Sequence, residues 1–134
     1  MKYFISEKEE SHFAHTKVKP SEAEKFDFSN AEEIVVYPGV IEEKIDPKGF
    51  VKNIIKTANS GCRLEFGFIN IYQLFVDAAF HRLDVGMAHK VCAGIQKPYN
   101  VAAAKHTLME CGLKIKKVYF EEELKIIKVE CENA

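Results

Sequence analysis

Long apolar runs and a strong net charge are both absent from this sequence. No apolar run in the 134-residue chain approaches the roughly 20 residues that a membrane-spanning helix needs. Nineteen basic and 20 acidic residues leave a net charge of −1, so no overall field favours nucleic acid or an anionic membrane. The opening residues turn acidic after a brief apolar run, unlike a signal peptide, and we therefore expect a cytoplasmic protein.

The cysteines are spaced too widely for the compact metal and disulfide motifs. The four residues, Cys62, Cys92, Cys111 and Cys131, form no CxxC pair. Because metal knuckles and disulfide frameworks need tighter or more numerous spacing, we expect reduced, buried thiols. With 47% apolar and 29% charged residues, residues 1–134 are expected to fold as one globular domain.

The first 30 residues predict only short elements. Residues 2–6, 16–18 and 25–28 are β-prone, and the polar residues 7–15 suit one or two helical turns. Pro20 would end the second strand, and the turn formers Ser29 and Asn30 would end the third.

Residues 34–61 carry stronger signals. The β-prone residues 34–37 suit a strand buried on both faces, and Pro38 with Gly39 ends it. Asp46 is a good helix N-cap, and Pro47 is a good first helical residue. The helix would end at Gly61, which suits a left-handed cap. Its apolar residues recur at helical spacing: Phe50, Val51, Ile54, Ile55 and Ala58.

The second half of the chain predicts strands and helices in alternation. Residues 63–69 alternate as a strand, and residues 71–83 form a helix. Residues 84–98 would be a loop, Asn100 would cap a helix over residues 101–111, and residues 113–120 and 124–131 would form an antiparallel hairpin. One face of the helix over residues 71–83 would be apolar, through Ile71, Leu74, Phe75, Ala78 and Ala79.

Strands that alternate with helices imply a three-layer αβα sandwich with a mainly parallel sheet. Residues 38–66 read PGVIEEKIDPKGFVKNIIKTANSGCRLEF. This stretch resembles the class I S-adenosylmethionine-dependent methyltransferase motif HVLEHIxDPxxFLxEIxRVLKPGGxLxI. Residues 40–43 match VLEH, Asp46 and Pro47 match DP, and Gly61 lies in the place of PGG. The ending, AAAKHTLMECGLKIKKVYFEEELKIIKVE, resembles that family's last helix and hairpin, in which the final strand inserts antiparallel.

The resemblance covers roughly residues 26–130 and implies a Rossmann-like methyltransferase fold with a reduced N-terminal half. In that family a Gly-rich turn after the first strand lets the backbone approach the cofactor. Here residues 7–10 are Glu-Lys-Glu-Glu, and no glycine precedes Gly39. The family's acidic residue at the end of the second strand is also missing, because Lys17 and Lys19 stand there and cannot accept hydrogen bonds from ribose hydroxyls. These two departures from the family pattern imply that cofactor binding is weakened or lost.

Several residues gain candidate roles from the resemblance. Asp27, Tyr37 and Gly39 would bind S-adenosylmethionine, although a lone aspartate after a strand is also a common turn residue. Glu43 replaces the family's histidine and could act as a base if burial raised its pKa. The alternative for Glu42 and Glu43 is a pair of solvated acids. His81 would be catalytic, and the substrate contacts would be Glu42, Arg82 and His89.

A metal site is not expected among the histidines. His81 and His89 do not have the i, i+4 spacing of helical ligands, and no third ligand lies near His12 and His15 in the sequence. The lysines of the terminal hairpin are balanced by glutamates, so they give no strong signal for nucleic acid.

Three functions remain open on the sequence alone. The chain could be a minimal methyltransferase with a small-molecule or sugar-type acceptor, because it looks most like small methyltransferase-like proteins associated with sugar and glycan genes. It could be a non-catalytic binding or assembly module of the same fold. It could also bind another nucleotide or a sugar at the same sheet edge. The short N-terminal half would leave apolar sheet surface exposed, and we therefore expect a homodimer.

Overall fold

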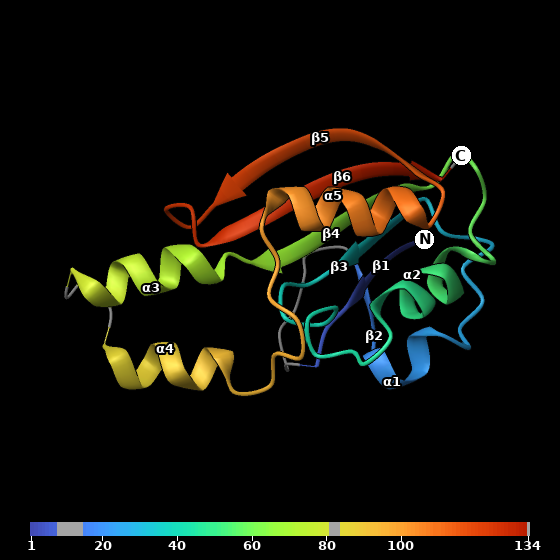
Figure 1. Ribbon diagram of the computed structural model, residues 1–134. Helices are drawn as coiled ribbons and strands as arrows, with labels where there is room; N and C mark the ends of the chain where they lie inside the picture. Colours follow the sequence, from blue (N-terminus) through green and yellow to red (C-terminus); the bar gives the residue numbers. More distant parts are fainter. Residues whose placement is uncertain (8–14, 81–83, 134) are drawn as a thin grey trace.

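Figure 1 shows a computed structural model of the chain, which describes residues 1–7, 15–80 and 84–133. The strands are β1 (Lys2–Ile5), β2 (Thr16–Val18), β3 (Glu33–Val36), β4 (Arg63–Ile69), β5 (Leu113–Glu121) and β6 (Ile126–Asn133). The helices are α1 (Pro20–Ala23), α2 (Pro47–Ile55), α3 (Ile71–Ala79), α4 (Val85–Cys92) and α5 (Val101–Glu110). None of the described helices is long and apolar enough to cross a membrane.

The strands form one six-stranded sheet in the order β2-β1-β3-β4-β6-β5. The first four strands are parallel, whereas β6 runs antiparallel between β4 and β5. This arrangement confirms the predicted Rossmann-like α/β fold and the antiparallel insertion of the last strand. The chain leaves β1 toward β2 on one side and returns to β3 on the other side. The carboxyl ends of β1 and β3 therefore flank a topological switch point, where open α/β sheets bind ligands.

The hydrophobic core lies against one face of the sheet. Alternate strand residues point into it, and α2 and α5 pack against each other over the same region (Figure 1). The core residues of β3, β4 and β6 are Ile34, Val36, Leu64, Phe66, Phe68, Ile127, Val129 and Cys131. They meet Phe50, Val51 and Ile54 of α2 and Ala104 and Leu108 of α5, which recur at helical spacing.

Local signals set the starts of two helices as predicted. Asp46 Oδ1 accepts a hydrogen bond from the Gly49 N–H at 3.0 Å, and Pro47 begins α2. Asn100 Oδ1 accepts one from the Ala103 N–H at 2.8 Å and begins α5. The predicted left-handed cap at Gly61 is wrong, because Gly61 does not have a positive φ. The left-handed glycine after a helix is instead Gly112, with a φ of 86°.

Two predictions of secondary structure are wrong. Residues 25–28 form no strand, because turns continue from α1: the Lys25 and Phe26 N–H groups donate to the carbonyls of Glu22 and Ala23. The predicted loop over residues 84–98 contains α4. Asp84 caps that helix, since its Oδ2 accepts from the Met87 N–H at 3.3 Å. In both places a few capping bonds decide the structure, and they outweigh the local composition.

The apolar face predicted for α3 is only partly buried. Leu74 is buried, but Phe75 and Ala79 are exposed. The charged residue Asp77 is buried instead, and its Oδ1 accepts a hydrogen bond from Gln73 Nε2 at 3.1 Å. The helix lies at the edge of the molecule (Figure 1), so helical periodicity alone did not identify the side that is covered.

Candidate functional site

A cavity of about 760 Å³ lies at the carboxyl ends of the parallel strands. Ser6 and Glu7 follow β1, residues 37–40 follow β3, and Ile69 ends β4. The other walls come from α3, α4 and the β5–β6 hairpin, through Leu74, Lys90, Glu121, Glu122, Lys125, Ile126 and Lys128. The cavity therefore occupies the topological switch point, and its volume is typical of small-molecule sites.

The turn after β3 is held close to the sheet. Pro38 lies over Gly67 of β4, where an added Cβ would come within 2.8 Å of the proline ring. Gly39 has a φ of 96°, which favours glycine because it lacks a Cβ. The Tyr37 N–H donates to the Ile5 carbonyl at 3.0 Å, and the Tyr37 ring lies 5.3 Å from that of Phe4. These contacts form a fixed cavity floor from residues 37–39.

Glu42 fastens this turn to the end of β4. Its side chain is 0% exposed, and Oε2 accepts hydrogen bonds from the Ile69 N–H at 2.7 Å and the Gly39 N–H at 3.2 Å. Burial raises the pKa of Glu42 to about 7, and hydrogen bonds from backbone N–H groups only partly oppose this effect. Glu42 does not line the cavity. Its geometry thus indicates a residue that positions the cavity floor, whereas the sequence predicted a substrate contact or a solvated acid.

Glu43 lies beside Glu42 in the chain but is exposed and lines the cavity. Its carboxylate packs against Gly94, where an added Cβ would lie 2.8 Å from Glu43 Oε1. A catalytic base at position 43 was expected to need burial to raise its pKa, yet the buried carboxyl group is that of Glu42. Catalysis by Glu43 stays a prediction, which its place in the cavity wall permits.

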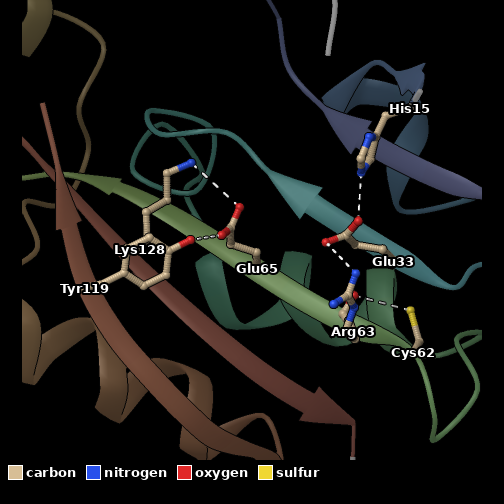
Figure 2. Close-up of polar contacts among 7 residues, drawn as sticks. All are labelled: His15, Glu33, Cys62, Arg63, Glu65, Tyr119 and Lys128. Carbon is tan, nitrogen blue, oxygen red and sulfur yellow. Dashed lines mark hydrogen bonds and ion pairs between the residues drawn. The ribbon is translucent and has the colours of Figure 1, made fainter. Parts of the chain in front are cut away.

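The hairpin side of the cavity carries a network of polar residues (Figure 2). Lys128 Nζ lies 3.7 Å from Glu65 Oε2 and 3.9 Å from Glu121 Oε2. The Tyr119 hydroxyl donates to Glu65 Oε1, and burial, together with this carboxylate, raises the pKa of Tyr119. Lys128 is thus neutralised by carboxylates of the protein itself. By contrast, Lys90 and Lys125 form no ion pair within the described part of the chain.

A second group of polar residues lies further along the same face of the sheet (Figure 2). Glu33 Oε2 lies 2.9 Å from His15 Nε2, and Glu33 Oε1 lies 3.6 Å from Arg63 Nη2. The residues of both networks on β3, β4 and β6 alternate with core residues, so they occupy the face opposite the core. Exposed apolar surface was expected on the sheet; this face carries these ion pairs together with the apolar side chains of Phe4 and Val35, which are buried.

The structure separates Asp27 from the other residues predicted to bind a cofactor. Tyr37 and Gly39 line the cavity together with Glu43. Asp27 is exposed in the turn that precedes β3, at the opposite end of that strand from Tyr37. Its Oδ1 accepts a hydrogen bond from the Ser29 N–H at 3.0 Å, and this bond lowers its pKa. The strand that was expected to place Asp27 at the site does not form, so Asp27 is an exposed turn residue.

Of the remaining predicted residues, the structure describes only His89. His89 is exposed on α4 and does not line the cavity, although its neighbour Lys90 does. His81 and Arg82 lie outside the described residues. Sequence reasoning missed Ser6, Glu7 and Lys125 as cavity residues. The positions of Ser6 and Glu7 directly after β1 could have identified them, but only the folded hairpin brings Lys125 to the cavity.

No protein-family model and no curated protein matches the chain. Solved structures do match it. A methyltransferase of Thermotoga maritima, described as a possible histamine N-methyltransferase, has a TM-score of 0.60 at 11% identity, over 90% of this chain and 65% of that one. The O-methyltransferase NcsB1 from neocarzinostatin biosynthesis, in complex with S-adenosylmethionine and a naphthoic acid, has a TM-score of 0.54 at 12% identity, over 77% and 29%.

A further match is a family 2 O-methyltransferase from Planctomyces limnophilus in complex with apigenin. Its TM-score is 0.54 at 10% identity, over 77% of this chain and 30% of that one. The chain spans about a third of the length of the O-methyltransferases that it matches. The matches over most of this chain show that it has the fold of S-adenosylmethionine-dependent methyltransferases.

Proposed function

We propose that the chain binds S-adenosylmethionine in this cavity and acts as a minimal methyltransferase on a small-molecule or sugar-type acceptor. The observation that carries the proposal is the position of the cavity at the switch point of a methyltransferase-like sheet. NcsB1, whose structure holds this cofactor and a naphthoic acid, supports both ligand classes. We further propose that the protein is a cytoplasmic homodimer.

The charges in the cavity suit S-adenosylmethionine. The ligand carries an ammonium group, a carboxylate and a sulfonium ion. Lys90 and Lys125 would attract its carboxylate, while Glu7 and Glu43 would attract its positive groups. Glu7 can also accept hydrogen bonds from ribose hydroxyls, which Lys19 at the end of β2 cannot do. Tyr37 and Gly39 would complete the floor, where the missing Cβ of Gly39 leaves room.

The residues of the chain suggest how an acceptor would be activated. When bound, S-adenosylmethionine supplies an electrophilic methyl group. The Glu43 carboxylate would accept the proton that an acceptor hydroxyl loses. Glu42 would hold the Gly39 and Ile69 backbone in place, and Leu74 would shield one side from water.

Calorimetric titration with S-adenosylmethionine and S-adenosylhomocysteine tests the proposal, with Lys125→Ala and Asp27→Ala as matched variants. We expect saturable binding that is about tenfold weaker in Lys125→Ala, because one charge-assisted contact is lost. Asp27→Ala should bind like the wild type, since Asp27 lies away from the cavity. Binding that is abolished by Asp27→Ala but unchanged by Lys125→Ala would show that the ligand lies elsewhere. No heat from a folded protein would reject cofactor binding.

The second candidate is a non-catalytic binding or assembly module. Its support is the turn after β1, where Glu7 places a side chain at the position that the family fills with glycine. This candidate predicts a folded chain that gives no heat with either cofactor form. The same titration therefore separates the two candidates.

A further inference from the structure

Helix α3 turns its apolar side chains toward solvent. Tyr72, Phe75, Val76 and Phe80 are between 42% and 67% exposed, whereas Asp77 is only 4% exposed. A helix at the surface of a monomer normally has the reverse arrangement, because apolar burial drives its packing. The exposed side of α3 carries no charged residue within Ile71–Ala79, since Asp77 is the only one there and is buried. Such a surface indicates a partner.

Neighbouring elements also expose apolar side chains. Helix α4 packs beside α3, and both project from one edge of the sheet (Figure 1). The tip of the β5–β6 hairpin is bound to the start of α3, because Asn70 Nδ2 donates to the Leu124 carbonyl at 2.9 Å and its N–H donates to the Lys125 carbonyl at 2.8 Å. The α3–α4 patch comprises the exposed side chains of Tyr72, Phe75, Val76, Phe80, Val85, Met87 and Leu124.

We propose that the α3–α4 patch binds the same patch of a second copy of this chain. Seven large side chains, each about half exposed, offer roughly 700 Å² of surface per copy, on the basis that a large side chain buries about 200 Å² when fully covered. A stable interface needs about 800 Å² per partner, so two apposed patches with their polar rims reach that size. A two-fold axis brings the α3 sides of two patches together, and their exposed residues carry no charge; the charged residues next to Val85 and Leu124 belong to the polar rim.

The inner side of the patch connects the dimer to the cavity. Leu74 of α3, Lys90 of α4 and Lys125 of the hairpin all line the cavity, while the outer residues of the same elements form the patch. A partner that restrains these elements therefore restrains the cavity wall. By linkage, dimerisation strengthens ligand binding and the ligand strengthens the dimer to the same degree. This coupling rests on the proposed function, whereas the dimer itself does not.

The dimer is tested by light scattering and analytical ultracentrifugation over a range of concentrations, with Phe75→Glu and Ile45→Glu as a matched pair. Ile45 is 93% exposed but lies in the loop before α2, outside the patch. We expect dimers of the wild type and Ile45→Glu, and a folded monomer of Phe75→Glu, with a dissociation constant raised at least about 100-fold. Circular dichroism verifies folding, and Tyr72→Ser provides a milder disruption if Phe75→Glu fails to fold.

Two results would overturn the dimer: a wild type that stays monomeric at high concentration, or variants of the patch that dimerise like the wild type. A monomer that sediments with phospholipid vesicles would assign the patch to a lipid surface instead. The coupling is tested by titrating the wild type and Phe75→Glu with S-adenosylhomocysteine, for which we expect at least tenfold weaker binding to the monomer. Equal affinities would reject the coupling. An intact dimer that gives no heat would reject the proposed function and leave the dimer standing.

Discussion

The wild-type protein is expected to lose stability as the pH rises to neutral, and the Glu42→Gln variant is expected not to. The Glu42 carboxyl group is 0% exposed, and burial raises its pKa to about 7. An unfolded chain exposes this group, whose ordinary pKa is 4.5. Between these values the folded protein binds more protons than the unfolded chain. The contribution of Glu42 to the free energy of unfolding therefore falls as the pH rises from about 4.5 to about 7. Above about pH 7 this contribution changes little.

The expected size of this effect is large for one side chain. The difference between the two pKa values corresponds to roughly 3 kcal/mol at full ionisation, of which 2 to 3 kcal/mol falls between pH 5 and pH 8. In Glu42→Gln the amide oxygen can still accept from the Gly39 and Ile69 N–H groups, and no buried charge forms. The variant should match the wild type near pH 5 and exceed it in stability near pH 8.

Urea unfolding of both proteins at pH 5 and pH 8 measures this difference. The matched control is Glu43→Gln, which changes the neighbouring carboxyl group without changing a buried one, because Glu43 is exposed. Its stability should follow the wild type at both pH values. If the wild type and Glu42→Gln lose stability in parallel between pH 5 and pH 8, the buried titration assigned to Glu42 is wrong.

Substituting Gly67 with alanine is expected to destabilise the protein and to deform the cavity floor. The added Cβ would lie 2.8 Å from Pro38 Cγ and Cδ and 2.9 Å from the Pro38 nitrogen. A rigid ring and a backbone atom cannot move aside alone, so residues 37–39 must shift away from β4. Overpacking of this kind costs about 1–3 kcal/mol. The shift also weakens the hydrogen bond between the Gly39 N–H and Glu42.

The control for this substitution is Gly61→Ala. Gly61 lies in the turn before β4, has no positive φ and has no atom within 4 Å of an added Cβ. We expect its free energy of unfolding to stay within about 0.5 kcal/mol of the wild type. If the proposed function holds, Gly67→Ala should also bind S-adenosylhomocysteine at least tenfold more weakly. Equal stability of the two variants would contradict the close packing of Pro38 on β4.

Local signals made the centre of the chain predictable. The N-cap Asp46, the helix-starting Pro47 and the alternation along residues 63–69 each act within a few neighbours, and α2 and β4 follow them. The same holds for the terminal hairpin, where two alternating segments flank a short acidic turn. Residues 25–28 failed as a strand because a short β-prone segment pairs only if a neighbouring strand is available, and here turns follow α1 instead.

The site was less predictable than the fold. Sequence position placed Tyr37, Gly39 and Glu43 at a strand end, and they do line one cavity. Sequence position could not distinguish Glu42 from Glu43, because the two acids are adjacent and chemically equivalent. Only in the folded protein does the Ile69 N–H of β4 donate a hydrogen bond to Glu42. It also grouped Asp27 with this edge on the assumption of a strand that does not form.

The sequence by itself determined β3, β4 and the terminal hairpin, the starts of α2 and α5, and the resemblance to methyltransferases. These depend on side-chain periodicity and capping, which are local along the chain. Only the tertiary structure decided which carboxyl group is buried, where Lys125 meets the cavity, and that α3 exposes its aromatic side. Those features depend on contacts between residues far apart in sequence, and desolvation arises only when such contacts exclude water.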